Sequence, residues 1–430
     1  MTEFVPLRGF KYNLNKLNTM KDLLCPPYDM ITPELKRSLE KQNKYNSIWL
    51  EGTSDSTDKE KYLKTKRIFD DWVNDEILIR DSQPNFQILK YTYQLNNVHF
   101  TLTGITGALR VEQYSSNNII THENTYAPIV QDRINLLENT GIQFSPILAT
   151  YRNASKPLSG LLDQITSSKP DLNVHIDEFS NIKIWKLINN TNNTLITQAL
   201  NHCKVFIADG HHRYEAALGI QNSTAFPNSA VNYVMATLVD IEDPGLQILP
   251  YHRILQNFKT TNFDVLEHNT SQIYDKKNVE DISEYDLSQL INIIQSNTRE
   301  KHSLCLLNEA TGKLITFSSP NGKELNNWGL LGESDAWIME KHIIKPILEN
   351  LPASKLTVNH NLFDTVKSVI ENKNSTGILF GSFPKESFEQ VALTGINLPP
   401  KSTFFYPKIP TGLVFHPTVL RGLSLISSSV

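Results

Sequence analysis

The chain has 430 residues, with 41 Lys and Arg against 45 Asp and Glu, which gives a formal net charge of −4 with histidine neutral. A composition of 40% hydrophobic and 20% charged residues excludes an intrinsically disordered chain, which has few apolar residues and a high net charge. Its apolar stretches, such as Val231–Ile241, are too short and interrupted to span a membrane. The slightly acidic balance also argues against a dedicated nucleic-acid binder, which is usually basic.

Targeting signals and cysteines indicate the compartment. The N-terminus, Met1–Pro6, lacks the basic region and apolar run of a secretory signal. The three cysteines, Cys25, Cys203 and Cys305, lie far apart and form no CxxC pair. Neither a cysteine-based zinc site nor a disulfide framework is therefore expected. We expect a reduced, cytoplasmic protein.

The predicted elements alternate between helices and strands, as hydrophobic periodicity and turn residues indicate. In chain order they are a helix opening at Thr32–Pro33, a helix over Tyr62–Glu76, a hairpin of Phe86–Leu95 and His99–Glu112 that turns at Asn96–Asn97, a helix over Gln131–Asn139, strands at Phe144–Tyr151, Ile182–Leu187 and Lys204–Ala208, a helix over Tyr214–Ile220 and a strand at Val231–Asp240. Further on come a hairpin over Ser303–Phe317, helices near Ser334–Asn350, Asp364–Asn372 and Lys385–Ala392, and a loop over Leu398–Pro407.

This mixture predicts an α/β fold of the mixed α+β kind. A shift in composition near Pro244 predicts an N-terminal α/β region over 1–245 and a C-terminal α/β region over 246–430. The stretch Ser155–Leu200 has the look of an insertion. The tail beyond Val414 has the composition of a loose terminus.

The densest functional signal is Asp209-Gly210-His211-His212-Arg213. A strand precedes it, the glycine permits a tight turn, and a helix follows, whose unpaired N–H groups and dipole favour an anion. The histidines and the arginine add donors suited to phosphate oxygens. A helix-capping aspartate followed by two surface histidines is the structural alternative. Metal chelation by the pair is disfavoured, because adjacent histidines on a helix point in different directions.

Two weaker motifs accompany this turn. In His122-Glu123-Asn124 the glutamate is a candidate general base, although most glutamates in such a pattern are solvated or cap a helix. In Pro399-Pro400-Lys401-Ser402-Thr403, a lysine and two hydroxyls in a proline-fixed loop favour a phosphate cradle, or simply a surface loop. The chain contains no GxxxxGK[ST] and no GxSxG motif. The candidate substrate-binding residues are His122, Arg133, His252 and Arg253.

Together these motifs resemble the free L-serine kinases of the ParB/sulfiredoxin-like superfamily. Those enzymes carry a His-Glu segment, then a strand with an Asp-Gly-His-His-Arg turn, then a Pro-Lys-Thr/Ser-Thr loop. The Asp-Gly-His-His-Arg-Tyr-Glu form also resembles a larger family of uncharacterised function, together with Pro26-Pro27-Tyr28-Asp29, Asp132-Arg133 and Phe405-Tyr406-Pro407-Lys408. The second resemblance covers nearly the whole chain, whereas the first covers three short motifs.

The kinase resemblance implies a role for each matching residue. Glu123 corresponds to the catalytic carboxylate that takes or orients the proton of the serine hydroxyl, and Asp209 contacts that hydroxyl or the magnesium-bound phosphate. Gly210, His211, His212 and Arg213 hold the phosphates. Lys401, Ser402 and Thr403 close over the nucleotide phosphates. The implied reaction uses ATP, or ADP, with Mg²⁺ and converts L-serine to O-phospho-L-serine; neither the metal ligands nor the oligomeric state follows from it.

The same superfamily supplies competing interpretations. Sulfiredoxins place a catalytic cysteine in the equivalent turn, where this chain has His211, which excludes that chemistry unless a distant cysteine substitutes. ParB-type proteins bind DNA through basic surfaces that do not stand out here, so no nucleic-acid or membrane partner is expected. A ParB-like module that binds or hydrolyses nucleotide without kinase activity remains an alternative, as does a metal-assisted hydrolase using the histidines.

Overall fold

The computed structural model describes residues 2–52, 59–152, 156–188, 190–223, 230–320 and 328–418. The chain has a mixed α/β structure, as predicted, and divides into two compact units. The first unit comprises Met1–Thr121, Thr125–Leu246 and Pro407–Val430, and the second comprises His122–Asn124 and Gln247–Tyr406. The predicted regions, 1–245 and 246–430, differ from these units in two segments, around 122–124 and after 406.

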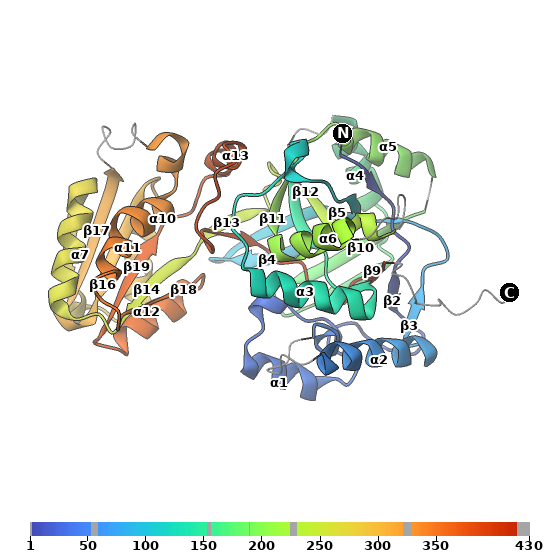
Figure 1. The fold of residues 1–430 in the computed structure, drawn as a ribbon, viewed down its shortest axis with the longest axis horizontal. Helices are drawn as coiled ribbons and strands as arrows, with labels where there is room; N and C mark the ends of the chain where they lie inside the picture. The colour runs from blue at the N-terminus through green and yellow to red at the C-terminus, as the bar shows by residue number, and fades with distance from the viewer. Residues whose placement is uncertain are drawn as a thin grey trace. The chain divides into compact units, whose positions relative to one another are not determined.

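A nine-stranded sheet forms the centre of the first unit, with the strand order β6-β11-β8-β12-β5-β4-β10-β9 and with β1 beside β5 (Figure 1). Its strands are β1 (Phe4–Val5), β4 (Phe86–Leu95), β5 (Val98–Arg110), β6 (Ile119–Ile120), β8 (Ile147–Tyr151), β9 (Leu172–His175), β10 (Asn181–Leu187), β11 (Val205–Asp209) and β12 (Tyr233–Asp240). Two short pairs join β2 (Phe10–Tyr12) to β3 (Leu78–Arg80) and β7 (Ile142–Gln143) to β21 (His416–Pro417). The helices are α1 (Pro33–Gln42), α2 (Glu60–Asn74), α3 (Ala127–Thr140), α4 (Lys156–Thr166), α5 (Asn190–Leu200) and α6 (His211–Ser223).

Local sequence signals account for much of this unit. Asn96 and Asn97 have φ values of 50° and 62°, which is the left-handed pair that a two-residue hairpin turn requires and that asparagine tolerates. Thr32 caps α1 by accepting a hydrogen bond from the Leu35 N–H at 3.2 Å, and Pro33 occupies the first turn. The hairpin and the helix start are therefore confirmed.

The stretch Ser155–Leu200, which looked like an insertion, contributes to the main sheet. Its strand β10 pairs with β4 from Asn181 to Leu187. Leu158 of α4 and Ile196 of α5 are buried in the same apolar cluster as the sheet. The described residues of this stretch thus contribute strand β10 to the sheet, and Leu158 and Ile196 to the core, of the first unit.

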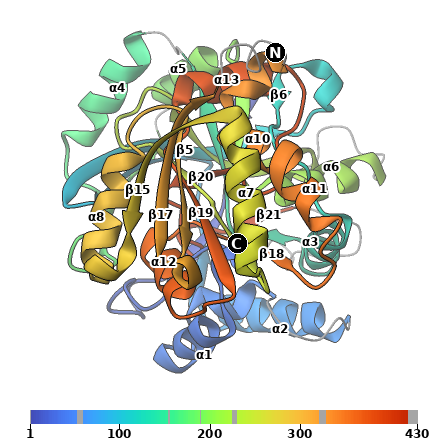
Figure 2. The same cartoon turned by 90° about the vertical axis from the view of Figure 1, so that its left-hand side faces the viewer.

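The second unit has a six-stranded antiparallel sheet in the order β15-β17-β16-β19-β14-β18. This unit faces the viewer in Figure 2. Its strands are β14 (His252–Gln256), β15 (Tyr274–Asp281), β16 (Ser303–Asn308), β17 (Lys313–Pro320), β18 (Lys355–Asn359) and β19 (Ser375–Phe380), and a separate pair joins β13 (Gln247–Pro250) to β20 (Thr403–Tyr406). The helices are α7 (Thr260–Ile273), α8 (Leu287–Asn297), α10 (Asp335–Ile338), a π-helical segment (Met339–Ile344), α11 (Lys345–Leu348), α12 (Leu362–Ile370) and α13 (Lys385–Leu393).

Helices cover both faces of this sheet. Successive side chains of a strand point to opposite faces, so they pack alternately against the helices on one face and on the other. Leu304 and Leu306 of β16 belong to the cluster that includes α7, whereas Cys305 and Leu307 belong to the cluster that includes α8 and α12. Each strand of the sheet's centre therefore contributes to two cores.

Two sequence-based expectations are wrong in part. The loop expected over Leu398–Pro407 contains strand β20, which pairs with β13. The tail after Val414 was expected to be loose, but Phe415 and His416 are buried and β21 pairs with β7; the rest of that prediction, beyond residue 418, lies outside the described residues. Among the described residues, no helix has the length and apolarity needed to cross a bilayer.

Candidate functional site

The turn between β11 and α6 is shaped by a glycine in a conformation that other residues rarely adopt. Gly210 has a φ of 93°. A Cβ at this position would lie 2.9 Å from Ile147 Cγ2 and 3.0 Å from Arg213 Nε and Nη2. The pairing of β11 with β8 also shifts register between Ile207 and Asp209, a bulge that re-aims the strand end. The predicted strand–glycine–helix geometry is therefore present.

Two cations hold the carboxylate of Asp209. Arg213 Nη2 donates to Asp209 Oδ2 at 2.9 Å, and Lys408 Nζ donates to Asp209 Oδ1. Arg213 Nη1 also donates to the Ser145 hydroxyl at 3.1 Å and to the carbonyl of Pro146. These groups place two positive side chains at the start of α6, where the helix dipole already favours negative charge.

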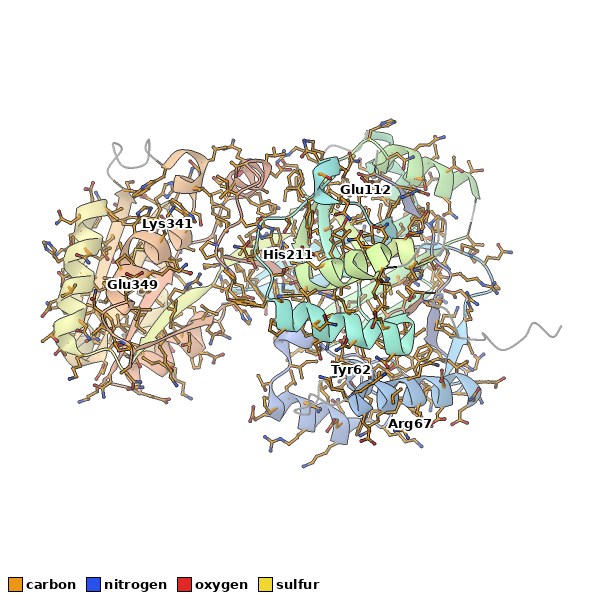
Figure 3. All side chains as sticks on the ribbon, in the orientation of Figure 1. Tyr62, Arg67, Glu112, His211, Lys341 and Glu349 are labelled. Carbon is orange, nitrogen blue, oxygen red and sulfur yellow. The ribbon has the colours of Figure 1, made fainter. Side chains whose placement is uncertain are left out.

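The two histidines of the turn point in different directions, as expected for adjacent helical positions. His211, labelled in Figure 3, is buried, with 7% of its surface exposed. His212 is partly exposed; its Nε2 accepts a hydrogen bond from the Tyr126 N–H at 3.1 Å, and its ring stacks on that of Tyr126. His211 is therefore the more buried of the two histidines, and His212 contacts Tyr126.

A layer of buried polar groups, centred on Arg133 and Glu51, lines a cavity that Arg213 of the turn also lines. Arg133 stacks on the ring of Tyr28, with 4.4 Å from its Cζ to the ring centroid, and Arg133 Nη1 donates to the carbonyl of Glu51 at 3.2 Å. Glu51 is 1% exposed and accepts a hydrogen bond from the Thr411 hydroxyl. A cavity of about 50 Å³ is lined by Glu51, Arg133, Arg213, Ser145 and apolar side chains of α3 and β7.

Burial and neighbouring charges shift the pKa values of the acidic groups in this layer. It raises the pKa of Glu51 above the usual 4.5, although Arg133 and the Thr411 hydrogen bond act in the opposite direction. It likewise raises the pKa of Tyr28 to about 12. Burial alone would also raise the pKa of Asp132, but Arg133 and Lys61 lower it to about 2. Arg133 thus serves as the central cation of this layer.

Glu123 lies in the second unit and is held by the predicted loop 401–403. Its carboxylate accepts backbone N–H groups from Lys401 at 3.3 Å, from Ser402 at 3.2 Å and from Thr403 at 3.4 Å. Glu123 also bridges Leu398 as a parallel strand partner. The structure therefore brings together two motifs that lie almost 280 residues apart in the sequence.

His122, a predicted substrate-binding residue, is buried beside the same loop. Its Nε2 lies 2.7 Å from the Thr403 hydroxyl, and its ring packs edge-on against Phe388 at 4.8 Å between centroids. The imidazole supports the hydroxyl of Thr403 from within the core.

His252 and Arg253 are enclosed in the second unit. His252 is 4% exposed, and its Nδ1 accepts the Phe380 N–H at 3.2 Å. Burial, with Arg253 and His360 beside it, lowers the pKa of His252 to about 3. Arg253 is 0% exposed and donates to the Lys401 carbonyl at 2.9 Å. Both side chains hold protein groups in the structure.

The described residues include no group of three or more His, Cys, Asp and Glu side chains placed to hold a metal ion. Magnesium is commonly bound by one or two carboxylates together with substrate phosphates and water. Both oxygens of the Asp209 carboxylate accept hydrogen bonds from cationic side chains, those of Arg213 and Lys408.

Lys408 and Glu51 were not among the predicted site residues. Lys408 belongs to the quoted Phe-Tyr-Pro-Lys motif, which was a signal of family membership without an assigned role. Its contact with Asp209 spans 199 positions, so no local pattern reveals it. Glu51 stands between a short apolar stretch and Gly52 and has no motif of its own.

A protein-family model matches most of the chain. The chain belongs to the family described as "Protein of unknown function (DUF1015)", whose model matches residues 4–353. The loop 399–403 and Lys408 lie beyond that match. No curated protein matches the chain.

Several solved structures are similar to the chain. They include a conserved hypothetical protein from Pyrococcus furiosus (13% identity, TM-score 0.34, covering 69% of this chain and 91% of that one), a free serine kinase in complex with AMP (11%, 0.35, 69% and 89%) and SbnI with a C-terminal truncation from Staphylococcus aureus (10%, 0.38, 72% and 87%).

Proposed function

We propose that the protein is a cytoplasmic small-molecule kinase that transfers a phosphoryl group from ATP, or ADP, to the hydroxyl of free L-serine, giving O-phospho-L-serine. The observation that carries this proposal is the turn 209–213, where Gly210 opens helix α6 and Arg213 and Lys408 flank Asp209. A helix N-terminus with two added cations is suited to phosphate oxygens. Phosphoryl transfer depends mainly on such positioning and charge neutralisation. The core around this turn is proposed to be of the ParB/sulfiredoxin-like kind.

The residue roles are proposed from the motifs. Gly210, His211, His212 and Arg213 hold the phosphates, and Asp209 contacts the acceptor hydroxyl or the magnesium-bound phosphate. Mg²⁺, when bound with the nucleotide, neutralises developing charge on the phosphate oxygens. Glu123 takes the proton of the serine hydroxyl as general base.

The loop 401–403 is assigned a modified role. Its three backbone N–H groups engage the carboxylate of Glu123, and a phosphate cannot use the same donors at the same time. We therefore assign these N–H groups to holding the base. Of the three side chains, Lys401 is assigned the contact with nucleotide phosphates, because the Ser402 hydroxyl donates to the Pro399 carbonyl and the Thr403 hydroxyl lies 2.7 Å from His122 Nε2.

The direct test is to incubate the pure protein with L-serine, Mg²⁺ and ATP or ADP and to follow phosphoserine by mass spectrometry. The Glu123→Gln variant should lose turnover while its melting temperature still rises with nucleotide, because a ligand that binds the folded form stabilises it. The matched control is Glu138→Gln, at an exposed position of α3. Absence of product with either nucleotide contradicts the kinase proposal, and a melting-point rise without product indicates a nucleotide-binding module.

A further inference from the structure

Arg253 is a buried cation that the proposed reaction leaves without a role. It lies on β14, between β19 and β18 in the sheet of the second unit, and is the largest fully buried side chain among the described residues. With 0% of its surface exposed, its guanidinium has no face on which a substrate carboxylate could bind. A charge so deeply buried is costly unless protein groups pair with it.

Its partners are one carboxylate and two backbone carbonyls. Arg253 Nη2 donates to Glu340 Oε2 at 3.3 Å, and Nη1 donates to the carbonyls of Tyr251 at 3.0 Å and of Lys401 at 2.9 Å. Glu340 belongs to the π-helical segment Met339–Ile344, a local irregularity often found at functional positions. The guanidinium fork therefore joins the core of the unit to the loop that holds Glu123.

The loop needs such support because its conformation is unfavourable by itself. Lys401 has a φ of 61°, in the left-handed region that is strained for a residue with a side chain. Successive N–H groups around a left-handed residue form a concave anion-binding nest. Here the N–H groups of residues 401–403 converge on the Glu123 carboxylate, and the Ser402 hydroxyl closes the turn by donating to the Pro399 carbonyl at 2.6 Å.

We propose that Arg253, paired with Glu340, is a positioning residue for Glu123: by fixing the Lys401 carbonyl it holds the left-handed turn whose three N–H groups orient the carboxylate. The effect on catalysis rests on the proposed function, whereas the effect on the conformation of residues 401–403 does not. It also differs from the expectation that Arg253 binds substrate.

The test uses a double variant that removes the ion pair without leaving a buried lone charge. Arg253→Met/Glu340→Leu should fold, since apolar replacement of a buried pair is commonly neutral or stabilising. Hydrogen–deuterium exchange at the amides of residues 401–403 should become at least tenfold faster, while the amides of β16 stay unchanged. In the kinase assay kcat should fall about 100-fold, with KM for serine within about twofold of wild type.

Two single variants keep the test informative if the double variant misfolds. Glu340→Gln retains a neutral acceptor for Arg253 but removes the pairing charge, so it should speed exchange at 401–403 less than Arg253→Lys, which cannot span the two carbonyls and the carboxylate. Unchanged exchange at 401–403 in the Arg253 variants overturns the proposal, and so does a rise in KM with kcat intact. If wild type makes no phosphoserine, the proposed function fails while the exchange result still decides the role of Arg253.

Discussion

Replacing Gly210 by alanine tests whether the turn before α6 is shaped as described. At a φ of 93° an alanine is strained by roughly 1–3 kcal/mol. Its Cβ would also stand 2.9 Å from the buried Ile147 methyl, and overpacking of this kind costs roughly 1–3 kcal/mol more. The two effects together should lower the unfolding free energy by about 2–6 kcal/mol and the melting temperature of the first unit by roughly 10 °C.

The same substitution should also weaken nucleotide binding. The new methyl would lie 3.0 Å from Arg213 Nε and Nη2, so the guanidinium that pairs with Asp209 must shift slightly. Scanning calorimetry with and without ADP measures both effects. The matched control is Gly160→Ala in α4, where a Cβ meets nothing within 4 Å and where alanine should stabilise the helix by about 0.5–1 kcal/mol. A Gly210→Ala protein with wild-type melting temperature and an undiminished rise with ADP would refute this reasoning.

Two further predictions concern the first unit. Lys408→Met removes one of the two cations that hold Asp209, and the loss of a charged hydrogen bond should lower the free energy of unfolding by about 1.5–3 kcal/mol; a urea midpoint equal to that of wild type would contradict this role. Because burial raises the pKa of Glu51 above 4.5, its folded form holds a proton more tightly than its unfolded form. The stability that this gives is complete below pH 4.5 and is lost as pH rises through the raised pKa. Wild type should therefore lose stability relative to Glu51→Gln as pH increases above 4.5, and parallel urea midpoints across that range would show the inference to be wrong.

Local sequence patterns predict a helix, strand or turn correctly where neighbouring residues alone determine the structure. The two asparagines at 96–97 determine a hairpin, and the strand, glycine and helix around residue 210 follow from apolar run, turn residue and periodicity. The strand at Thr403–Tyr406 was missed because two prolines and a lysine precede it, whereas its pairing with Gln247–Pro250 is a long-range event. The tail was misjudged for the same reason, since only pairing with Ile142–Gln143 reveals that its first residues are buried.

The candidate site was less accessible from sequence than the fold. The turn 209–213 is contiguous and could be identified, but the partners of Asp209 and of Glu123 come from residues 408 and 401–403, far along the chain. Sequence also suggested a phosphate role for the loop 401–403, because a lysine and hydroxyls are typical of phosphate cradles. It could not show that the backbone N–H groups of that loop already have a carboxylate partner.

The return of the chain after residue 406 to the first unit has a practical consequence. Because Lys408, Thr411 and β21 all belong to that unit, a gene fragment ending at Leu246 lacks the lysine on Asp209 and the hydroxyl on Glu51. In topological terms the segment 247–406 is inserted within its host. Isolating the host for spectroscopy or crystallisation therefore calls for excision of that segment and a short linker across the gap, instead of a simple C-terminal truncation.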